Sequence, residues 1–230
     1  MLFRPLFDPE TSTYTYLIGD RTTGEAALVD SVLEQVDRDL QVLSELGLTL
    51  RYTLETHVHA DHVTGAGKLR QQTQCDGVVP AGAMVECADQ TLQDNEVLMV
   101  GTIPIQAIAT PGHTDSHMTF LVDQTHLLTG DSLLIRGCGR TDFQSGDPGL
   151  LFDAIVNRLF NLPEETVVCP GHDYRGQIFS TIGEEKRWNP RLVNRTRAQF
   201  IEFMNGLNLP DPKKIAEAVP ANQQCGQVAA

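Results

Sequence analysis

The sequence predicts one mixed α/β (α+β) domain whose strands end in polar, chemically active residues. The chain has 230 residues, of which 41% are hydrophobic and 6% aromatic, and a chain of this size and composition can bury a sizeable core in one domain. Short apolar or alternating runs, typical of strands, recur between segments whose apolar residues have helical spacing. Several of these runs lead directly into a His or an Asp, so the strand ends are candidates for a functional site.

Strands are predicted wherever a short apolar or alternating run lies between turn-forming residues. The first two runs are separated by glycine, aspartate and threonine, so we expect them to pair. Most of the later runs stop at a polar residue or a glycine turn. The predicted strands are 14–18, 26–29, 51–55, 103–109, 118–122, 127–129 and 166–169.

Helices are predicted where apolar residues recur three or four positions apart. Ser31 can cap the first helix and Gly47 ends it, the second begins inside a histidine-rich motif, and a glycine-rich loop precedes the third. The predicted helices are 31–46, 61–74, 150–160, 190–205 and 212–218. We expect residues 10–175 to form the core of the domain and residues 176–230 a helical C-terminal extension.

Charge and cysteine content restrict the partners and the compartment. A formal net charge of −13 argues against nucleic acid, which requires a basic face, and means that an anionic substrate needs local arginines. We expect no signal peptide or membrane span, because no apolar run is long enough, and no transit segment, because the start is not rich in arginine and serine. Five scattered cysteines, odd in number, argue against a disulfide or zinc-knuckle framework, so we expect a reducing, cytoplasmic location.

The motif at 56–62 (THVHADH) predicts a metal site. His57 and His59 share a face of an extended chain, and Asp61 and His62 follow where the chain turns. Imidazole and carboxylate ligands together suit Zn, Fe or Mn. These residues could instead cap a helix, but so dense a group of histidines and an aspartate favours a metal.

Three more strands end in a candidate ligand. His113 follows in the turn PGHT, Asp131 in TGD and His172 in PGH. Each has a structural alternative: His113 and His172 could be loop histidines held by backbone bonds, and Asp131 could cap a turn. His117 and His126 flank strands without a glycine turn, so we interpret them as structural or surface residues.

Taken in order, 56–62, 111–114, 129–131 and 170–172 resemble the metallo-β-lactamase superfamily over about residues 10–175. The resemblance implies an αββα sandwich of two mainly antiparallel sheets with helices outside and a metal site at one edge. Within the superfamily, the persulfide dioxygenases (sulfur dioxygenases) are similar over nearly the whole chain, at 130–144, 169–174, 184–191 and 208–222.

This family resemblance implies one Fe(II) per chain, held by His57, His113 and Asp131. It assigns the remaining polar residues to an outer shell, although they could also complete a second metal site: His59, Asp61, His62 and His172. The implied reaction oxidises glutathione persulfide with O₂ and water to sulfite and glutathione, and the implied assembly is a homodimer. Alternatives are a glyoxalase II-type hydroxyacylglutathione hydrolase with two metals and a non-catalytic persulfide or metal sensor.

Glutathione carries two carboxylates, so arginines near the site are candidate contacts. Arg136, in the glycine-rich loop after Asp131, is the first candidate. Cys138 could be oxidation-sensitive or a buried, inert thiol. Further candidates are Arg140, Arg175 and Arg187, each of which could equally form a structural ion pair, the hydroxyl of Tyr174, and Thr114, which could also steady the His113 loop.

Overall fold

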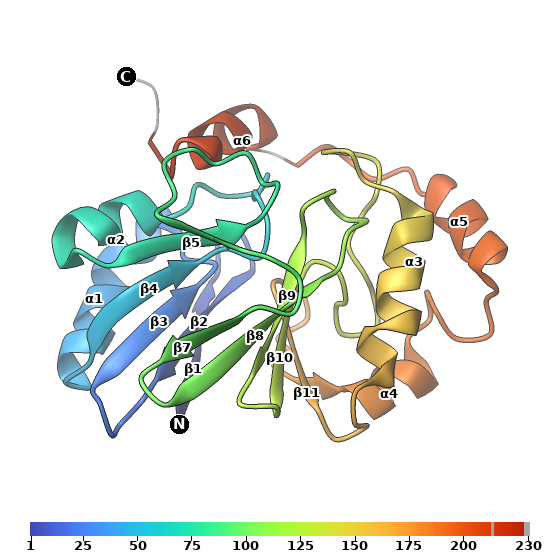
Figure 1. Ribbon diagram of the computed structural model, residues 1–230. Coiled ribbons are helices and arrows are strands. Elements are labelled where there is room, and N and C mark those ends of the chain that lie inside the picture. Colours follow the sequence, from blue (N-terminus) through green and yellow to red (C-terminus); the bar gives the residue numbers. More distant parts are fainter. Residues whose placement is uncertain (213, 228–230) are drawn as a thin grey trace.

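Two six-stranded sheets pack face to face in the computed structural model, which describes residues 1–212 and 214–227 (Figure 1). In spatial order the first sheet contains β1 (Leu2–Asp8), β2 (Thr13–Gly19), β3 (Glu25–Val29), β4 (Thr49–Leu54), β5 (Asp76–Pro80) and β6 (Gln90–Leu92). The second contains β12 (Ser180–Thr181), β11 (Val167–Pro170), β10 (His126–Gly130), β9 (Met118–Val122), β8 (Ile103–Ala109) and β7 (Val97–Val100).

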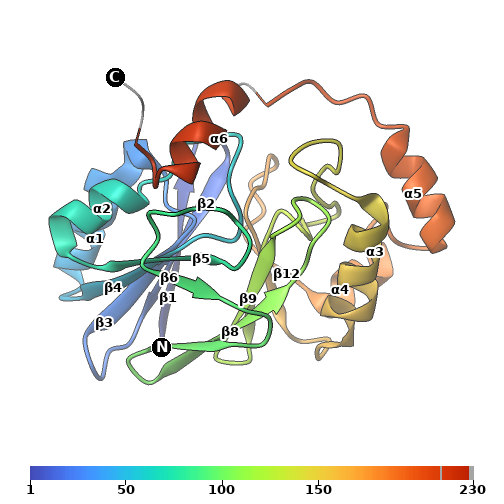
Figure 2. The same cartoon turned by 45° about the horizontal axis from the view of Figure 1, so that its top comes forward.

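Helices cover the outer faces of both sheets, as the αββα resemblance implies (Figures 1 and 2). On the first sheet lie the 3-10 turn Leu33–Gln35, α1 (Val36–Glu45) and α2 (Ala66–Thr73). On the second lie α3 (Pro148–Asn157), the 3-10 turn Leu159–Asn161, α4 (Ile182–Trp188) and α5 (Arg197–Asn205). Helix α6 (Ile215–Gln223) lies at the top of the molecule, close to β5 and α2.

Strand β2 shows how alternation builds these layers. All of its residues are buried. Tyr14, Tyr16 and Ile18 pack into the core between the sheets, whereas Leu17 packs under the helices α1 and α2. The hydroxyl of Tyr16 donates to the carbonyl of Pro170 at 2.8 Å and so ties the first sheet to β11 of the second.

Both sheets are mixed. In the second sheet only β10 and β11 run parallel. In the first, β3–β4, β4–β5 and β5–β6 are all parallel pairs, so the expectation of two mainly antiparallel sheets is wrong for this one. For the first two of these pairs the reason is that α1 and α2 are crossover helices, which return the chain to the same end of the sheet.

Several predicted elements are confirmed and others are corrected. The strands 103–109 and 118–122 have the bounds predicted for them. The helix predicted at 61–74 begins only at Ala66, so Asp61 and His62 lie in a loop. The helix predicted at 190–205 begins at Arg197, because Thr196 caps it through a reciprocal bond with Gln199. Part of the predicted helix 212–218, residue 213, lies outside the described residues.

The sequence did not predict several elements that are short or lie at the edge of a sheet: β1, β5, β6, β7, β12 and α4. None of the helices within residues 1–212 and 214–227 has the length and hydrophobicity of a membrane span.

A disulfide joins Cys87 and Cys225, which contradicts the expectation that the cysteines do not pair. The two residues are 138 positions apart, so their spacing carries no signal, and only the return of α6 to the first sheet brings them together. The remaining cysteines, Cys75, Cys138 and Cys169, are free and buried.

Candidate metal centre

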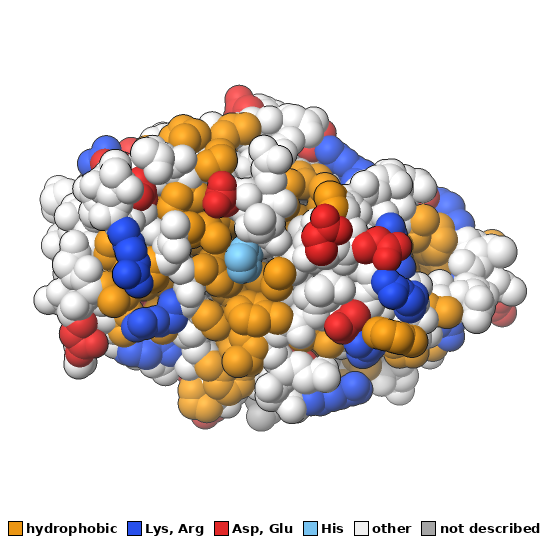
Figure 3. Space-filling view, turned by 90° about the horizontal axis from the view of Figure 1, so that it is seen from below, with side chains coloured by type: hydrophobic (Ala, Val, Ile, Leu, Met, Phe, Trp, Pro, Cys, Tyr) orange, Lys and Arg blue, Asp and Glu red, His pale blue; other side chains and the backbone are white. Residues whose placement is uncertain are grey.

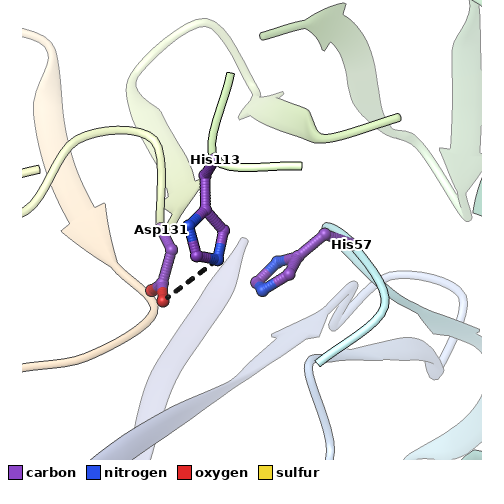
Figure 4. Close-up of side chains that lie close together, drawn as sticks. All are labelled: His57, His113 and Asp131. Atoms are coloured by element: carbon purple, nitrogen blue, oxygen red, sulfur yellow. Dashed lines mark ion pairs between the residues drawn. The ribbon is translucent and has the colours of Figure 1, made fainter. Parts of the chain in front are cut away.

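Three strand ends bring His57, His113 and Asp131 together at the top edge of the two sheets. They follow β4, β8 and β10, and one ligand atom from each lies within 4.8 Å of the others. The rings of His57 and His113 and the carboxylate of Asp131 point toward one another, and His113 Nε2 lies 3.7 Å from Asp131 Oδ2 (Figure 4). Three of the strand-end residues that the sequence singled out therefore lie together.

Thr56 orients the ring of His57. The Thr56 hydroxyl donates to Asp30 Oδ2 at 2.9 Å, so its oxygen can accept a hydrogen bond from His57 Nδ1, also at 2.9 Å. This places the ring proton on Nδ1 and leaves Nε2 as a free electron pair. Burial, together with the neighbouring histidines, holds the pKa of His57 well below its usual value, so the ring is neutral, as a metal ligand must be.

A backbone carbonyl orients His113. Its Nδ1 lies 2.7 Å from the carbonyl oxygen of Arg140, and because a carbonyl only accepts, Nδ1 carries the proton and Nε2 is free. Gly112 makes this turn with φ of 135°, where a Cβ atom would lie 2.3 Å from the backbone nitrogen of Leu151. The glycine before His113 is therefore required by a close approach.

Glycines also surround Asp131. A Cβ atom at Gly139 would lie 2.2 Å from the Asp131 carbonyl oxygen, and one at Gly171 would lie 2.9 Å from Asp131 Oδ1. The backbone nitrogen of Gly139 donates to that same carbonyl at 2.7 Å. The glycine-rich segments thus let two neighbouring loops close around the carboxylate.

His117, predicted to be structural or a surface residue, is buried beside this cluster. Its Nε2 accepts a bond from the Asp131 backbone nitrogen at 3.2 Å, and its ring stacks on His57 with centroids 5.0 Å apart. Burial lowers the pKa of His117 to about 3, so the ring is neutral. His117 therefore packs against the ring of His57 and bonds the backbone of Asp131.

His172 bridges two carboxylates. Its Nδ1 lies 2.7 Å from Asp131 Oδ1 and its Nε2 lies 2.8 Å from Asp61 Oδ2. Burial alone would lower the pKa of His172, but the two carboxylates raise it well above its usual value. The same contact with His172 outweighs burial at Asp131 and lowers the pKa of that carboxyl. Both nitrogens of His172 are thus engaged.

Two further groups could hold an ion. His59, Asp61 and His62 form one, and Asp30, Glu55 and His59 form the other. The buried atoms His59 Nδ1 and His62 Nε2 have no hydrogen-bond partner among the described residues. His59 Nε2 lies 3.0 Å from Asp30 Oδ1, and the carboxylates of Asp30 and Glu55 raise the pKa of His59 despite its burial.

Sequence reasoning missed Asp30 and Glu55 in this arrangement. Asp30 directly follows β3, so the strand-end signal that singled out Asp131 applies to it as well. Asp30 also accepts a 2.7 Å bond from the backbone nitrogen of Thr56, which anchors the start of the histidine motif.

A cavity of about 430 Å³ opens above His57, His113 and Asp131, within the size range of small-molecule sites. Arg140, Tyr174 and Arg191 line it. Arg140 pairs with Asp142 at 2.6 Å and donates to the carbonyl of Pro210 at 2.7 Å. Arg191, which the sequence did not single out, donates through one terminal nitrogen to the carbonyl of Cys138 at 2.8 Å.

Arg136 does not line the cavity. Its guanidinium pairs with Glu184 at 2.9 Å and with Glu185, and it donates to Ser180. Its charge is therefore already balanced by two glutamates, which argues against the predicted role as the first substrate contact. Similarly, Arg187 pairs with Glu164 at 2.7 Å.

The other predicted contacts also differ. Arg175 is exposed and lies outside the lining of the cavity. Thr114 is buried and lines a separate cavity of about 240 Å³, so it does not face the space above His113. Burial raises the pKa of the Cys138 thiol, which favours the inert alternative for that cysteine.

Comparison with known proteins identifies the family. The family model "Metallo-beta-lactamase superfamily" matches residues 8–172. The "Persulfide dioxygenase ETHE1, mitochondrial" of Bos taurus is 45% identical over 230 residues, covering 98% of this chain and 89% of the relative. The chain belongs to the persulfide dioxygenase family of this superfamily.

Solved structures agree with this assignment. The crystal structure of ETHE1 from Myxococcus xanthus has a TM-score of 0.96 and 52% identity, covering 99% of this chain and 100% of that chain. Among the sequence relatives, by contrast, a hydroxyacylglutathione hydrolase of Cereibacter sphaeroides is 35% identical, covering 80% of this chain and 72% of its own length. The similarity to the persulfide dioxygenases is higher and more complete, so the resemblance stated from the motifs is confirmed.

Proposed function

We propose that this protein is an Fe(II)-dependent persulfide dioxygenase that oxidises glutathione persulfide. The observation that carries the proposal is the cluster of two imidazole nitrogens with free electron pairs and one carboxylate, at the floor of a cavity lined by arginines. The overall reaction consumes one glutathione persulfide, one O₂ and one water, and forms sulfite, glutathione and two protons. The terminal sulfur supplies the four electrons that O₂ accepts.

His57, His113 and Asp131 would hold one iron. The donor set fits: both histidines present Nε2 as a free electron pair, and the carboxyl of Asp131 has a lowered pKa. Two histidines and one carboxylate are typical of non-haem Fe(II) sites that leave positions open. Fe(II), when bound, supplies those open positions and the redox chemistry that O₂ requires and Zn lacks.

The surrounding polar residues would orient this set as an outer shell. His172 holds Asp131 Oδ1 at 2.7 Å, and Asp61 holds His172 at 2.8 Å. His172 thus contacts a proposed iron ligand through one ring nitrogen and Asp61 through the other, as an outer-shell residue would. His59 and His62 would extend the shell through Asp30 and Asp61. Such partners typically tune metal affinity and ligand basicity.

Arg191 and Tyr174 would bind the glutathione portion, while Arg140, whose guanidinium nitrogens all bond Asp142 or the carbonyl of Pro210, would shape the cavity wall. Arg191 uses one terminal nitrogen on Cys138, and its other donors can pair with a substrate carboxylate in the fork geometry that arginine favours. Tyr174 is 75% exposed and its ring lies parallel to His172, with centroids 6.1 Å apart. Its hydroxyl is thus available to the peptide part of the substrate.

The decisive experiment compares two reactions on protein of known metal content. We expect oxygen uptake with glutathione persulfide, stoichiometric sulfite, and close to one iron per chain. Hydrolysis of S-lactoylglutathione with two metals per chain and no oxygen uptake would instead establish the hydrolase. Tight persulfide binding by the iron-loaded protein without turnover would establish a sensor.

Two arginine variants test the substrate contacts. Arg191→Gln should raise the KM for glutathione persulfide roughly tenfold or more, because a charged pair inside the cavity is lost. Arg175→Gln, outside the cavity, is the matched control and should leave KM unchanged. A KM for Arg191→Gln no higher than that for Arg175→Gln would remove Arg191 from the proposed binding set.

We also propose the homodimer implied by the family resemblance. On the face seen from below, hydrophobic side chains gather in a broad central area with charged residues mainly around it (Figure 3). Contiguous exposed apolar area of this kind supports self-association. Light scattering should give twice the mass of the 25.3 kDa chain, and a monomeric mass at micromolar concentration would refute the dimer.

A further inference from the structure

The loop that carries the histidine motif has few backbone partners of its own. It connects β4 to α2, and residues 57–62 have no regular secondary structure. Buried polar backbone groups in such a loop need hydrogen-bond partners from elsewhere in the protein. In this protein much of that bonding comes from a single side chain in the C-terminal helix.

Asn222 of α6 makes three hydrogen bonds to this loop. Its Nδ2 donates to the carbonyl oxygens of His59 and His62, both at 2.9 Å, and its Oδ1 accepts from the backbone nitrogen of Thr64 at 2.8 Å. The side chain is 5% exposed. Both donors and the acceptor of Asn222 are therefore used. The backbone groups that they bond lie 158 to 163 positions away in the sequence.

The geometry points to Asn222 as a positioning residue for the active-site loop. The loop presents Asp61, which bonds His172 at 2.8 Å, and His172 in turn bonds Asp131 at 2.7 Å. A shift of the loop backbone would thus reach a proposed metal ligand through two hydrogen bonds. Asn222 itself lines a small internal space and does not line the substrate cavity.

The end of α6 is anchored so that Asn222 keeps this position. The disulfide to Cys87 holds Cys225, whose carbonyl also accepts from the Gly67 nitrogen at 3.0 Å. At Gly226, where φ is 80°, a Cβ atom would lie 2.2 Å from the Thr64 carbonyl oxygen. Ala218 and Ala221 pack against Val63 of the loop. Several independent contacts therefore join the C-terminal helix to the motif.

Asn222→Asp is the sharpest perturbation. It preserves size and shape and keeps an acceptor for the Thr64 nitrogen, but it replaces both donors with oxygen that faces two carbonyl oxygens. Gln224→Glu makes the same chemical change two residues away, on an exposed side chain, and is the matched control.

Hydrogen exchange and steady-state kinetics test the inference together. In Asn222→Asp the amides of residues 58–64 should exchange roughly tenfold faster than in the control. The kcat of persulfide oxidation should fall roughly tenfold, as for other partners that orient metal ligands. KM should change less than about twofold, because the cavity wall is untouched.

Exchange and kcat within twofold of the control would overturn the inference. If the aspartate variant does not accumulate as folded protein, Asn222→Ala removes the donors without adding charge, and the same outcomes apply to it. The kinetic arm rests on the proposed function: a parent protein without persulfide-dependent oxygen uptake refutes that function, whereas the exchange of residues 58–64 still tests Asn222.

Discussion

A methyl group at Gly139 should displace two of the proposed metal ligands. The Cβ atom of an alanine would lie 2.2 Å from the carbonyl oxygen of Asp131 and 2.8 Å from Nδ1 of His113. Ordinary carbon–oxygen contacts are at least about 3.3 Å, so the two loops must separate by about 1 Å. The first atom met is backbone, so no rotation of a flexible side chain relieves the clash.

The effect on catalysis should exceed the effect on stability. A misplacement of about 1 Å at a reacting site can cost roughly 100-fold in rate, equivalent to about 3 kcal/mol of transition-state stabilisation. Overpacking costs about 1–3 kcal/mol of folding free energy, which a domain of this size should tolerate. We therefore expect folded Gly139→Ala protein with strongly reduced metal content and activity.

The assay measures iron per chain, kcat/KM for persulfide-dependent oxygen uptake, and the melting temperature. Gly137→Ala is the control in the same loop, because its Cβ atom would meet only Leu134 at an ordinary 3.7 Å. Metal content and kcat/KM of Gly139→Ala within twofold of Gly137→Ala would refute the idea that this close approach sets the ligand geometry.

Three further perturbations test separate parts of the molecule. Asp39 is buried, which raises the pKa of its carboxyl from 3.8 to about 6. The folded state thus binds more protons between about pH 4 and 6, and stability falls as pH rises through this window. Asp39→Asn should stabilise the protein at pH 7 by up to about 3 kcal/mol, with no gain below pH 4; equal gains at both pH values in urea unfolding would contradict this. Thr56→Val removes the partner of His57 Nδ1 and should weaken metal binding by roughly tenfold; an unchanged dissociation constant in a metal titration would exclude this orienting role. Replacing both Cys87 and Cys225 with serine opens a bridge across 138 positions and should cost up to about 5 kcal/mol in the chain-entropy account, so a melting temperature equal to that of the parent would count against the bridge.

Local pattern was sufficient for two strands of the second sheet. Residues 103–109 and 118–122 were predicted with their observed bounds because their buried faces alternate or are continuous. Helix α2 starts later than predicted because the loop before it is bonded to Asn222, far away in sequence. The parallel pairing of β3, β4 and β5 depends on which way the crossover helices fold back, and this is not a property of any single segment.

The sequence by itself determined the metal motif, the order of strand ends and the family, because each depends on residue identity and spacing along the chain. Only the tertiary structure decided which nitrogen of His57 and of His113 is free. The other nitrogen of His57 bonds Thr56, which is itself bonded to Asp30, and the other nitrogen of His113 bonds the carbonyl of Arg140. The tertiary structure likewise decided that Arg191 lines the cavity, whereas Arg136 is neutralised by Glu184 and Glu185. The physical reason is the same in each case: the direction, protonation and free charge of a side chain depend on partners that only folding brings within hydrogen-bond distance.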